Sequence, residues 1–199
     1  LENYSYFSIP KCYSLLSMQA LNQVGILPIQ NHSTIQLSGK QVMIGFLDTG
    51  IDYQNPVFQH LDKTTRIAGI WDQTIQSGTP PESFDYGSHY TPDMINVALA
   101  SEDPYSLVPS VDNNGHGTFL ASIAAGSGDP DAQFIGAAPE SVIAVVKLKQ
   151  AKQYLRDYYF IPNTAPAFQE NDIMLGMRYL HLLAEKLGLP LIFCLALGS

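Results

Sequence analysis

An aspartate and a histidine stand in the two settings of this chain that best suit acid–base chemistry. Asp48 directly follows the apolar run 41–47 and precedes a glycine turn. His116 has a glycine on each side, which lets the backbone turn tightly and lets a ligand approach the imidazole. A carboxylate can fix the tautomer of an imidazole and stabilise its protonated form, while the other ring nitrogen takes a proton from a serine. Asp48 and His116 are therefore candidates for two of the three members of a charge-relay arrangement.

Each candidate also has a purely structural interpretation. An aspartate before a glycine turn often only closes that turn, and a lone histidine most often packs in a core or lies on the surface. The glycines around His116 favour chemistry in its case. The remaining histidines have no such neighbours and lie in loop-like segments or within a strong helix: His32, His60, His89 and His181.

The elements that must position these residues are indicated by short apolar runs, which are typical of strands. These runs are 41–47, 66–71, 141–149 and 191–197. Helical periodicity covers Asn171–Leu187, and a run of small residues at 119–125 follows His116. Strands that alternate with helices need crossover connections, so the sequence predicts an α/β fold with a mostly parallel sheet and helices on both faces. Asp48 would then lie at the rim where the strands end, which is where such sheets place their ligands.

Three segments lack this core pattern. Residues 1–37 resemble a lead-in with a helix at Ser14–Val24, and the segment that follows is loop-like. Residues 72–111 are rich in proline, glycine and serine, which predicts an inserted surface loop with one helical turn near 93–100. Residues 153–168 form an aromatic loop. Loops of this length are usually functional or mobile rather than filler.

The composition excludes several classes of protein. The 199 residues are 46% hydrophobic and 14% charged, as expected of a globular domain with one core. A net charge of −8 with scattered acids argues against a nucleic-acid partner. No stretch approaches the ~20 apolar residues of a membrane span. Cys12 and Cys194 are too few and too far apart for a disulfide framework or a metal site, and Cys194 is expected to be a buried core thiol.

Four segments resemble the motifs of subtilisin-like serine proteases (subtilases). VMIGFLDTGID around Asp48 resembles their aspartate motif, and DNNGHGTFLASIAAG around His116 resembles their histidine motif. IGAAP at 135–139 is similar to the G-x-A-P that precedes the next strand, and LALGS at 195–199 is similar to the strand that lines the substrate cleft. The order aspartate, histidine and then serine is the subtilase order.

Other segments resemble one branch of that family, the subtilases of clostridial spore germination. They are IPKCYSLL in the lead-in, WDQT at 71–74 and KLKQAKQYLRDYYFIP at 147–162. This branch resemblance implies an extracellular or spore-associated location, with a cytoplasmic one left open.

The resemblance implies a serine endopeptidase that hydrolyses peptide bonds through an acyl-enzyme. Asp48 would be the orienting acid and His116 the general base. Leu197 and Gly198 would pair through backbone hydrogen bonds with an extended peptide or protein substrate. The segment after Lys149 would form the opposite wall of the cleft.

The chain departs from the family pattern in lacking the nucleophile. It contains no G-T-S-x-[AS] stretch, so the serine and the asparagine of the oxyanion hole would both lie beyond residue 199. Residues 38–199 are therefore expected to be the N-terminal part of a catalytic domain, inert by itself. The resemblance also implies an inhibitory prodomain, removed ahead of the lead-in.

No metal or cofactor is expected. Many subtilases have His-Pro-Asp where this chain has Asn55-Pro56-Val57, so a calcium-ligating carboxylate is replaced by an apolar side chain. Asp129 and Asp131 flank a proline and are more typical of a solvated turn than of a calcium site.

The sequence is also to be judged against three alternative functions. An aspartic protease shares Asp-Thr-Gly but needs a second copy of it, and the chain has none. A phosphate-binding ATPase leaves His116 and its glycines unexplained. A subtilase-fold pseudoprotease that acts as a binding or regulatory protein is opposed by the intact Asp48 and His116, but the missing serine leaves it open.

Overall fold

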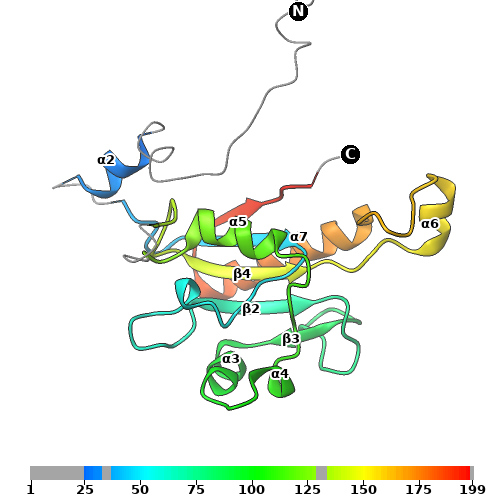
Figure 1. Ribbon diagram of the computed structural model, residues 1–199, viewed down its shortest axis with the longest axis horizontal. Coiled ribbons are helices and arrows are strands. Elements are labelled where there is room, and N and C mark those ends of the chain that lie inside the picture. Colours follow the sequence, from blue (N-terminus) through cyan, green and yellow to red (C-terminus); the bar gives the residue numbers. More distant parts are fainter. Residues whose placement is uncertain (1–24, 33–36, 129–133, 198–199) are drawn as a thin grey trace, which may run out of the picture.

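The computed structural model describes residues 25–32, 37–128 and 134–197 (Figure 1). The helix predicted at Ser14–Val24 lies outside these residues, as do Gly198 and the Asp129–Asp131 turn. The first described helix is α2 (Ile26–Gln30), in a segment that the sequence had predicted to be a loop. Among the described residues, no helix combines the length and the apolar composition needed to cross a bilayer.

Five strands form one mixed sheet in the order β3-β2-β4-β1-β5. The parallel strands are β1 (Met43–Asp48), β2 (Ile67–Asp72), β4 (Val142–Lys147) and β5 (Leu191–Cys194). The short β3 (Ser88–Tyr90) pairs with β2 in the antiparallel sense. The prediction of a mostly parallel α/β sheet is confirmed, and the strand bounds differ from the predicted ones by one to three residues.

Strand β1 lies between β4 and β5, and all six of its residues are buried. Side chains alternate between the two faces of a strand, so Ile44 and Phe46 enter one hydrophobic cluster while Met43 and Leu47 enter the other. The same alternation assigns Asp48 to the face of Ile44 and Phe46. That face is the one covered by the helix of His116.

Two helices cover the opposite faces of the sheet (Figure 1). Helix α5 (His116–Ala125) packs its small residues Ala121 and Ala125 into the cluster of Ile44 and Phe46. Helix α7 (Glu170–Leu187) packs Leu180 and Ala184 into the cluster of Met43 and Leu47. The predicted arrangement of helices on both faces is therefore present.

The segment 72–111 is not the surface loop that the sequence predicted. Besides β3 it forms α3 (Pro92–Leu99) and α4 (Pro104–Leu107), and Ile95, Ala98 and Val108 are fully buried. Two of its prolines, Pro92 and Pro104, begin helices, where a missing N–H costs nothing, so a proline-rich composition did not exclude helices here. The segment adds a layer to the core of the α5 face.

The apolar composition of the run 191–197 predicted a buried strand, and this prediction is wrong. Only Leu191–Cys194 is strand, and β5 ends the described sheet, so Ile192 and Leu195 are about half exposed. Cys194 is half-buried rather than a core thiol, and burial together with the charge of Asp48 raises the pKa of this thiol. Two short helices complete the fold: η2 (Pro56–Phe58) and α6 (Gln153–Tyr158).

Candidate active site

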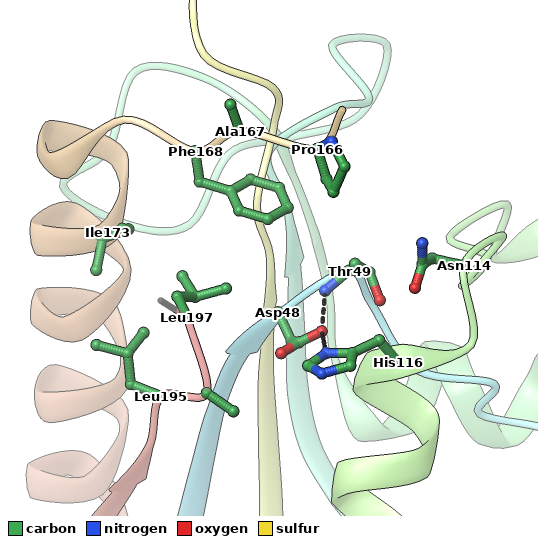
Figure 2. Close-up of a pocket in the computed structure, with 11 residues that line it drawn as sticks. Asp48, Thr49, Asn114, His116, Pro166, Ala167, Phe168, Ile173, Leu195 and Leu197 are labelled. Carbon is green, nitrogen blue, oxygen red and sulfur yellow. Dashed lines mark hydrogen bonds and ion pairs between the residues drawn. The ribbon is translucent and has the colours of Figure 1, made fainter. Parts of the chain in front are cut away.

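The site is built where the ends of β1 and α5 meet. Asp48 is the last residue of β1 and His116 is the first residue of α5. Asp48 Oδ1 lies 2.8 Å from His116 Nδ1 (Figure 2). The sequence predicted that these side chains meet at the carboxyl end of a central parallel strand, and the structure confirms the contact.

Glycines permit this close approach of helix and strand. A Cβ atom on Gly117 would lie 2.2 Å from the carbonyl oxygen of Gly50 and 3.2 Å from Cβ of Asp48, so no larger residue fits there. Gly115 adopts φ 84° at the start of α5, a conformation that favours glycine. The two glycines thus set the position of His116 against Asp48.

The surroundings of the pair suit an orienting acid and an accessible base. The carboxylate of Asp48 is 2% exposed, and its Oδ1 also accepts a hydrogen bond of 2.7 Å from the Thr49 N–H. Its Oδ2 is buried and has no hydrogen-bond partner among the described residues. The His116 side chain is 44% exposed. Because a carboxylate only accepts, it selects the tautomer with the proton on Nδ1, which leaves Nε2 free to accept a proton.

Asp112 holds the two halves of the site together, and the sequence reasoning gave it no role. Its Oδ1 accepts from the Thr49 hydroxyl at 2.8 Å and from the Gly115 N–H at 2.9 Å. Its Oδ2 accepts from both the N–H and the hydroxyl of Thr118, at 2.8 and 2.7 Å. Burial alone would raise the pKa of Asp112, but the hydrogen bonds from Thr118, Thr49 and Gly115 outweigh it and lower the pKa. The carboxylate thus connects the loop after β1 to the first turn of α5.

We expect Asp112→Ala to lower kcat/KM of the complete protein by about 100-fold, since misplacement of reacting groups by about 1 Å has effects of that size. Stability should fall by about 1–3 kcal/mol, because donors lose their acceptor. The hydrogen bonds hold the pKa of Asp112 in the folded protein below its ordinary value of 3.8. The ionised carboxylate therefore stabilises the fold above about pH 3.8, and this contribution is lost as the pH falls through the folded-state pKa.

Peptide hydrolysis and calorimetric melting between pH 3 and pH 7 measure these effects. Asp112→Asn is the matched control, because it keeps an acceptor oxygen but cannot titrate. The melting temperature of this variant should no longer show the decrease at acid pH that protonation of Asp112 causes in the wild type. An unchanged kcat/KM in Asp112→Ala would show that the carboxylate does not position His116.

An open pocket of ≈ 570 Å³ adjoins the pair (Figure 2). Three segments line it: the Asp48–His116 region with Thr49 and Asn114, the strand end 195–197, and residues 166–168 with Ile173. Leu197, predicted to bind substrate, is among the lining residues, whereas Gly198 lies outside the described residues. Of the predicted opposite wall after Lys149, only the far end at 166–168 reaches the pocket together with Ile173 of α7.

A second charged pair lies beside the site but does not join it. Lys147 is the register partner of Asp48 in the sheet, yet its Nζ lies 3.3 Å from Oδ2 of Asp72. Asp72 is fully buried and also accepts a hydrogen bond of 2.7 Å from the Ser110 hydroxyl. Lys147 is thus paired with Asp72, and His116 remains the side-chain hydrogen-bond partner of Asp48.

The described residues offer no cluster of side chains suited to a metal ion. In this part of the chain, no three His, Cys, Asp or Glu side chains lie close enough together to hold a metal ion. Asn55 caps η2 by accepting from the Val57 N–H at 3.1 Å, and Val57 packs against the core of the α5 face. The other acids considered, Asp129 and Asp131, lie outside the described residues.

The chain is similar to known proteins in its sequence and in its fold. The model of the subtilase family (Peptidase_S8) matches residues 39–172. The chain is 32% identical over 131 residues to the subtilisin-like protease SBT2.2 of Arabidopsis thaliana, a match that covers 56% of this chain and 15% of that protein. The related SBT2.3 is 31% identical over 102 residues, covering 46% of this chain and 12% of that protein.

Among solved structures, the chain is similar to the Clostridium perfringens CspB protease, with 31% identity and a TM-score of 0.76. That match covers 92% of this chain and 34% of the CspB chain. A psychrophilic protease, S41, shares the fold at 21% identity and a TM-score of 0.51, over 88% of this chain and 43% of that one. The chain therefore spans about a third of the CspB chain and 15% of the length of SBT2.2.

Proposed function

The chain belongs to the subtilase family, and we propose that the complete protein is a serine endopeptidase in which Asp48 orients His116 and His116 is the general base. The observation that carries this proposal is the 2.8 Å contact between Asp48 Oδ1 and His116 Nδ1 beside an open pocket. Residues 38–199 would form the N-terminal part of the catalytic domain. Residues 1–37 would form a lead-in to it.

The proposed mechanism assigns each proton to a stated atom. Nε2 of His116 takes the proton of a serine hydroxyl as that oxygen attacks the scissile carbonyl, and the Asp48 carboxylate stabilises the imidazolium that forms. Nε2 then protonates the leaving amine, which leaves an acyl-enzyme, and water repeats the sequence to release the acid product. The serine and the oxyanion donor come from residues outside this chain, so residues 1–199 alone are expected to be inert.

The pocket supports a peptide or protein as the substrate. One of its walls is the chain that continues β5 to Leu197, and an extended peptide would add to this segment as a further strand, with Leu197 and Gly198 as its backbone partners. The remaining lining is largely apolar, with Phe168, Ile173 and Leu195. The resemblance of the lead-in and of residues 147–162 to the spore-germination branch supports an extracellular or spore-associated location.

Hydrolysis of β-casein by the complete protein tests this proposal. We expect cleavage that a serine-directed sulfonyl fluoride abolishes and that a metal chelator leaves intact. A complete protein that folds but cleaves neither casein nor short peptides would favour the pseudoprotease, in which Asp48 and His116 remain without a catalytic role.

A further inference from the structure

Four aromatic side chains are exposed on the loop between β4 and α7. Tyr158, Tyr159 and Phe160 are 73%, 65% and 92% exposed, and Tyr154 is 64% exposed. The rings of Tyr158 and Tyr159 pack edge to face, with their centroids 4.9 Å apart. Exposed aromatic groups that gather in one place are typical of interaction surfaces, because their burial against a partner removes a large apolar area from water.

The loop that carries these rings is held in one shape by its own hydrogen bonds. The side chain of Arg156 is buried at its centre and donates to the carbonyl oxygens of Pro162 at 2.6 Å and Ala165 at 2.7 Å. At its base, the Ala151 N–H donates to the Ala167 carbonyl at 2.8 Å. We call residues 150–168 the aromatic clip. The backbone that carries the rings is thus held in one shape by these hydrogen bonds, which lowers the entropy cost of binding a partner.

Phe160 is unfavourable for the stability of the fold. Its φ is 55°, in the left-handed region that disfavours bulky residues, and its ring gains little from packing at 92% exposure. Glycine or asparagine at this position would cause less strain and expose less apolar surface. Strained residues of this kind cluster where binding or catalysis requires them.

The base of the clip is part of the candidate active site. Residues 166–168 line the pocket beside Asp48 and His116, whereas α6 stands clear of the rest of the molecule beyond the end of β4 (Figure 1). A polypeptide in the pocket contacts the base of the clip at 166–168, and if it continues past Phe168 it can also contact the exposed rings farther out on the same loop. We propose that the exposed rings of the clip bind the protein substrate outside the pocket.

The exposed residues of the clip indicate which kind of partner it can bind. Lys152 and Asp157 are its exposed charged residues, and Arg156 is buried with its guanidinium on the carbonyl oxygens of Pro162 and Ala165. The exposed surface of the clip is therefore mainly aromatic, with one exposed cation and one exposed anion, which fits apolar stretches of a protein substrate. Binding to an anionic membrane is typical of clusters of Lys and Arg, and the clip exposes one Lys beside one Asp. This inference rests on the proposed endopeptidase function.

The double variant Tyr158→Ser, Phe160→Asn of the complete protein tests the inference. Both side chains are exposed in the part of the protein that the structure describes, and asparagine tolerates a positive φ, so the melting temperature should not fall. A fall would show that the rings pack against the rest of the complete protein and would overturn the inference. We expect kcat/KM for β-casein to fall about tenfold, the size of effect that an interface hot spot gives. For a tetrapeptide spanning the same bond, which extends over at most about 14 Å, kcat/KM should change less than about twofold.

Val97→Ser is the matched control, because Val97 is 62% exposed on α3, away from the clip. It should leave both substrates unaffected. An equal loss for casein and tetrapeptide, or no loss for casein, would overturn the inference, as would binding of phosphatidylserine vesicles that the double variant abolishes. Hydrolysis of the tetrapeptide by the wild type tests the proposed function separately from the clip.

Discussion

Replacement of His116 by alanine should abolish turnover in the complete protein while the fold remains. In subtilisin, removal of the corresponding general base lowers kcat by about 10⁶-fold, and we expect a loss of that order here. Such a factor corresponds to about 8 kcal/mol of transition-state stabilisation. The structural cost is far smaller: the side chain is 44% exposed, and its loss mainly deprives the buried Asp48 of one hydrogen bond, worth about 1–3 kcal/mol.

Single-turnover and steady-state kinetics with a short peptide measure the first effect, and calorimetry measures the second. His181→Ala is the control, because His181 is 62% exposed on α7 and contacts only Glu185 among charged groups of the described residues, at 3.4 Å. It should leave kcat unchanged. A collapse of the melting temperature in His116→Ala would instead identify His116 as a structural residue.

Asp48→Asn should lower kcat by about 10⁴-fold and leave the structure nearly intact. The asparagine has the shape of the aspartate, but its amide can donate to Nδ1 and so favours the tautomer with the proton on Nε2. That tautomer cannot take the proton of a serine, and loss of the carboxylate also removes the charge that stabilises the imidazolium. In proteases with this triad, the same exchange or the loss of the aspartate costs about 10⁴-fold in kcat.

The control for this variant is Asp52→Asn in the same motif. Asp52 accepts a hydrogen bond from the Gln54 N–H at 3.2 Å, whereas the side-chain hydrogen bond of His116 is to Asp48. Its replacement should change kcat by no more than about threefold, an effect of less than 1 kcal/mol. If Asp48→Asn kept kcat within tenfold of the wild type, Asp48 would be a turn residue and not the orienting acid.

Much of the site could be predicted from local sequence patterns. The apolar run before Asp48 forms the central strand, and the alternation of side chains along it selects the face on which Asp48 meets α5. Of the glycines beside His116, Gly117 is needed for the close contact with Gly50, and Gly115 for its left-handed backbone conformation. Helix α7 was predicted to within one residue at its start because its apolar face repeats with helical periodicity.

Other features depend on contacts between residues far apart in the chain, and a local sequence pattern cannot predict such contacts. Asp112 reaches Thr49 across 63 positions of the chain, so its role appears only once β1 and α5 lie together. Prolines that begin α3 and α4 look like loop residues until Ile95 and Val108 are found buried. An apolar strand has the same composition at the edge of a sheet as at its centre, which is why β5 was predicted to be buried.

Labelling of the complete protein with a fluorophosphonate probe tests the central claim most directly. The probe reacts with a serine that an adjacent imidazole activates, so the modified residue can be mapped by mass spectrometry in the wild type and in His116→Ala. We predict one labelled serine beyond residue 199 in the folded wild type and none in His116→Ala. The absence of any labelled serine in the wild type, or equal labelling of both proteins, would contradict the assignment of Asp48 and His116 to a catalytic triad.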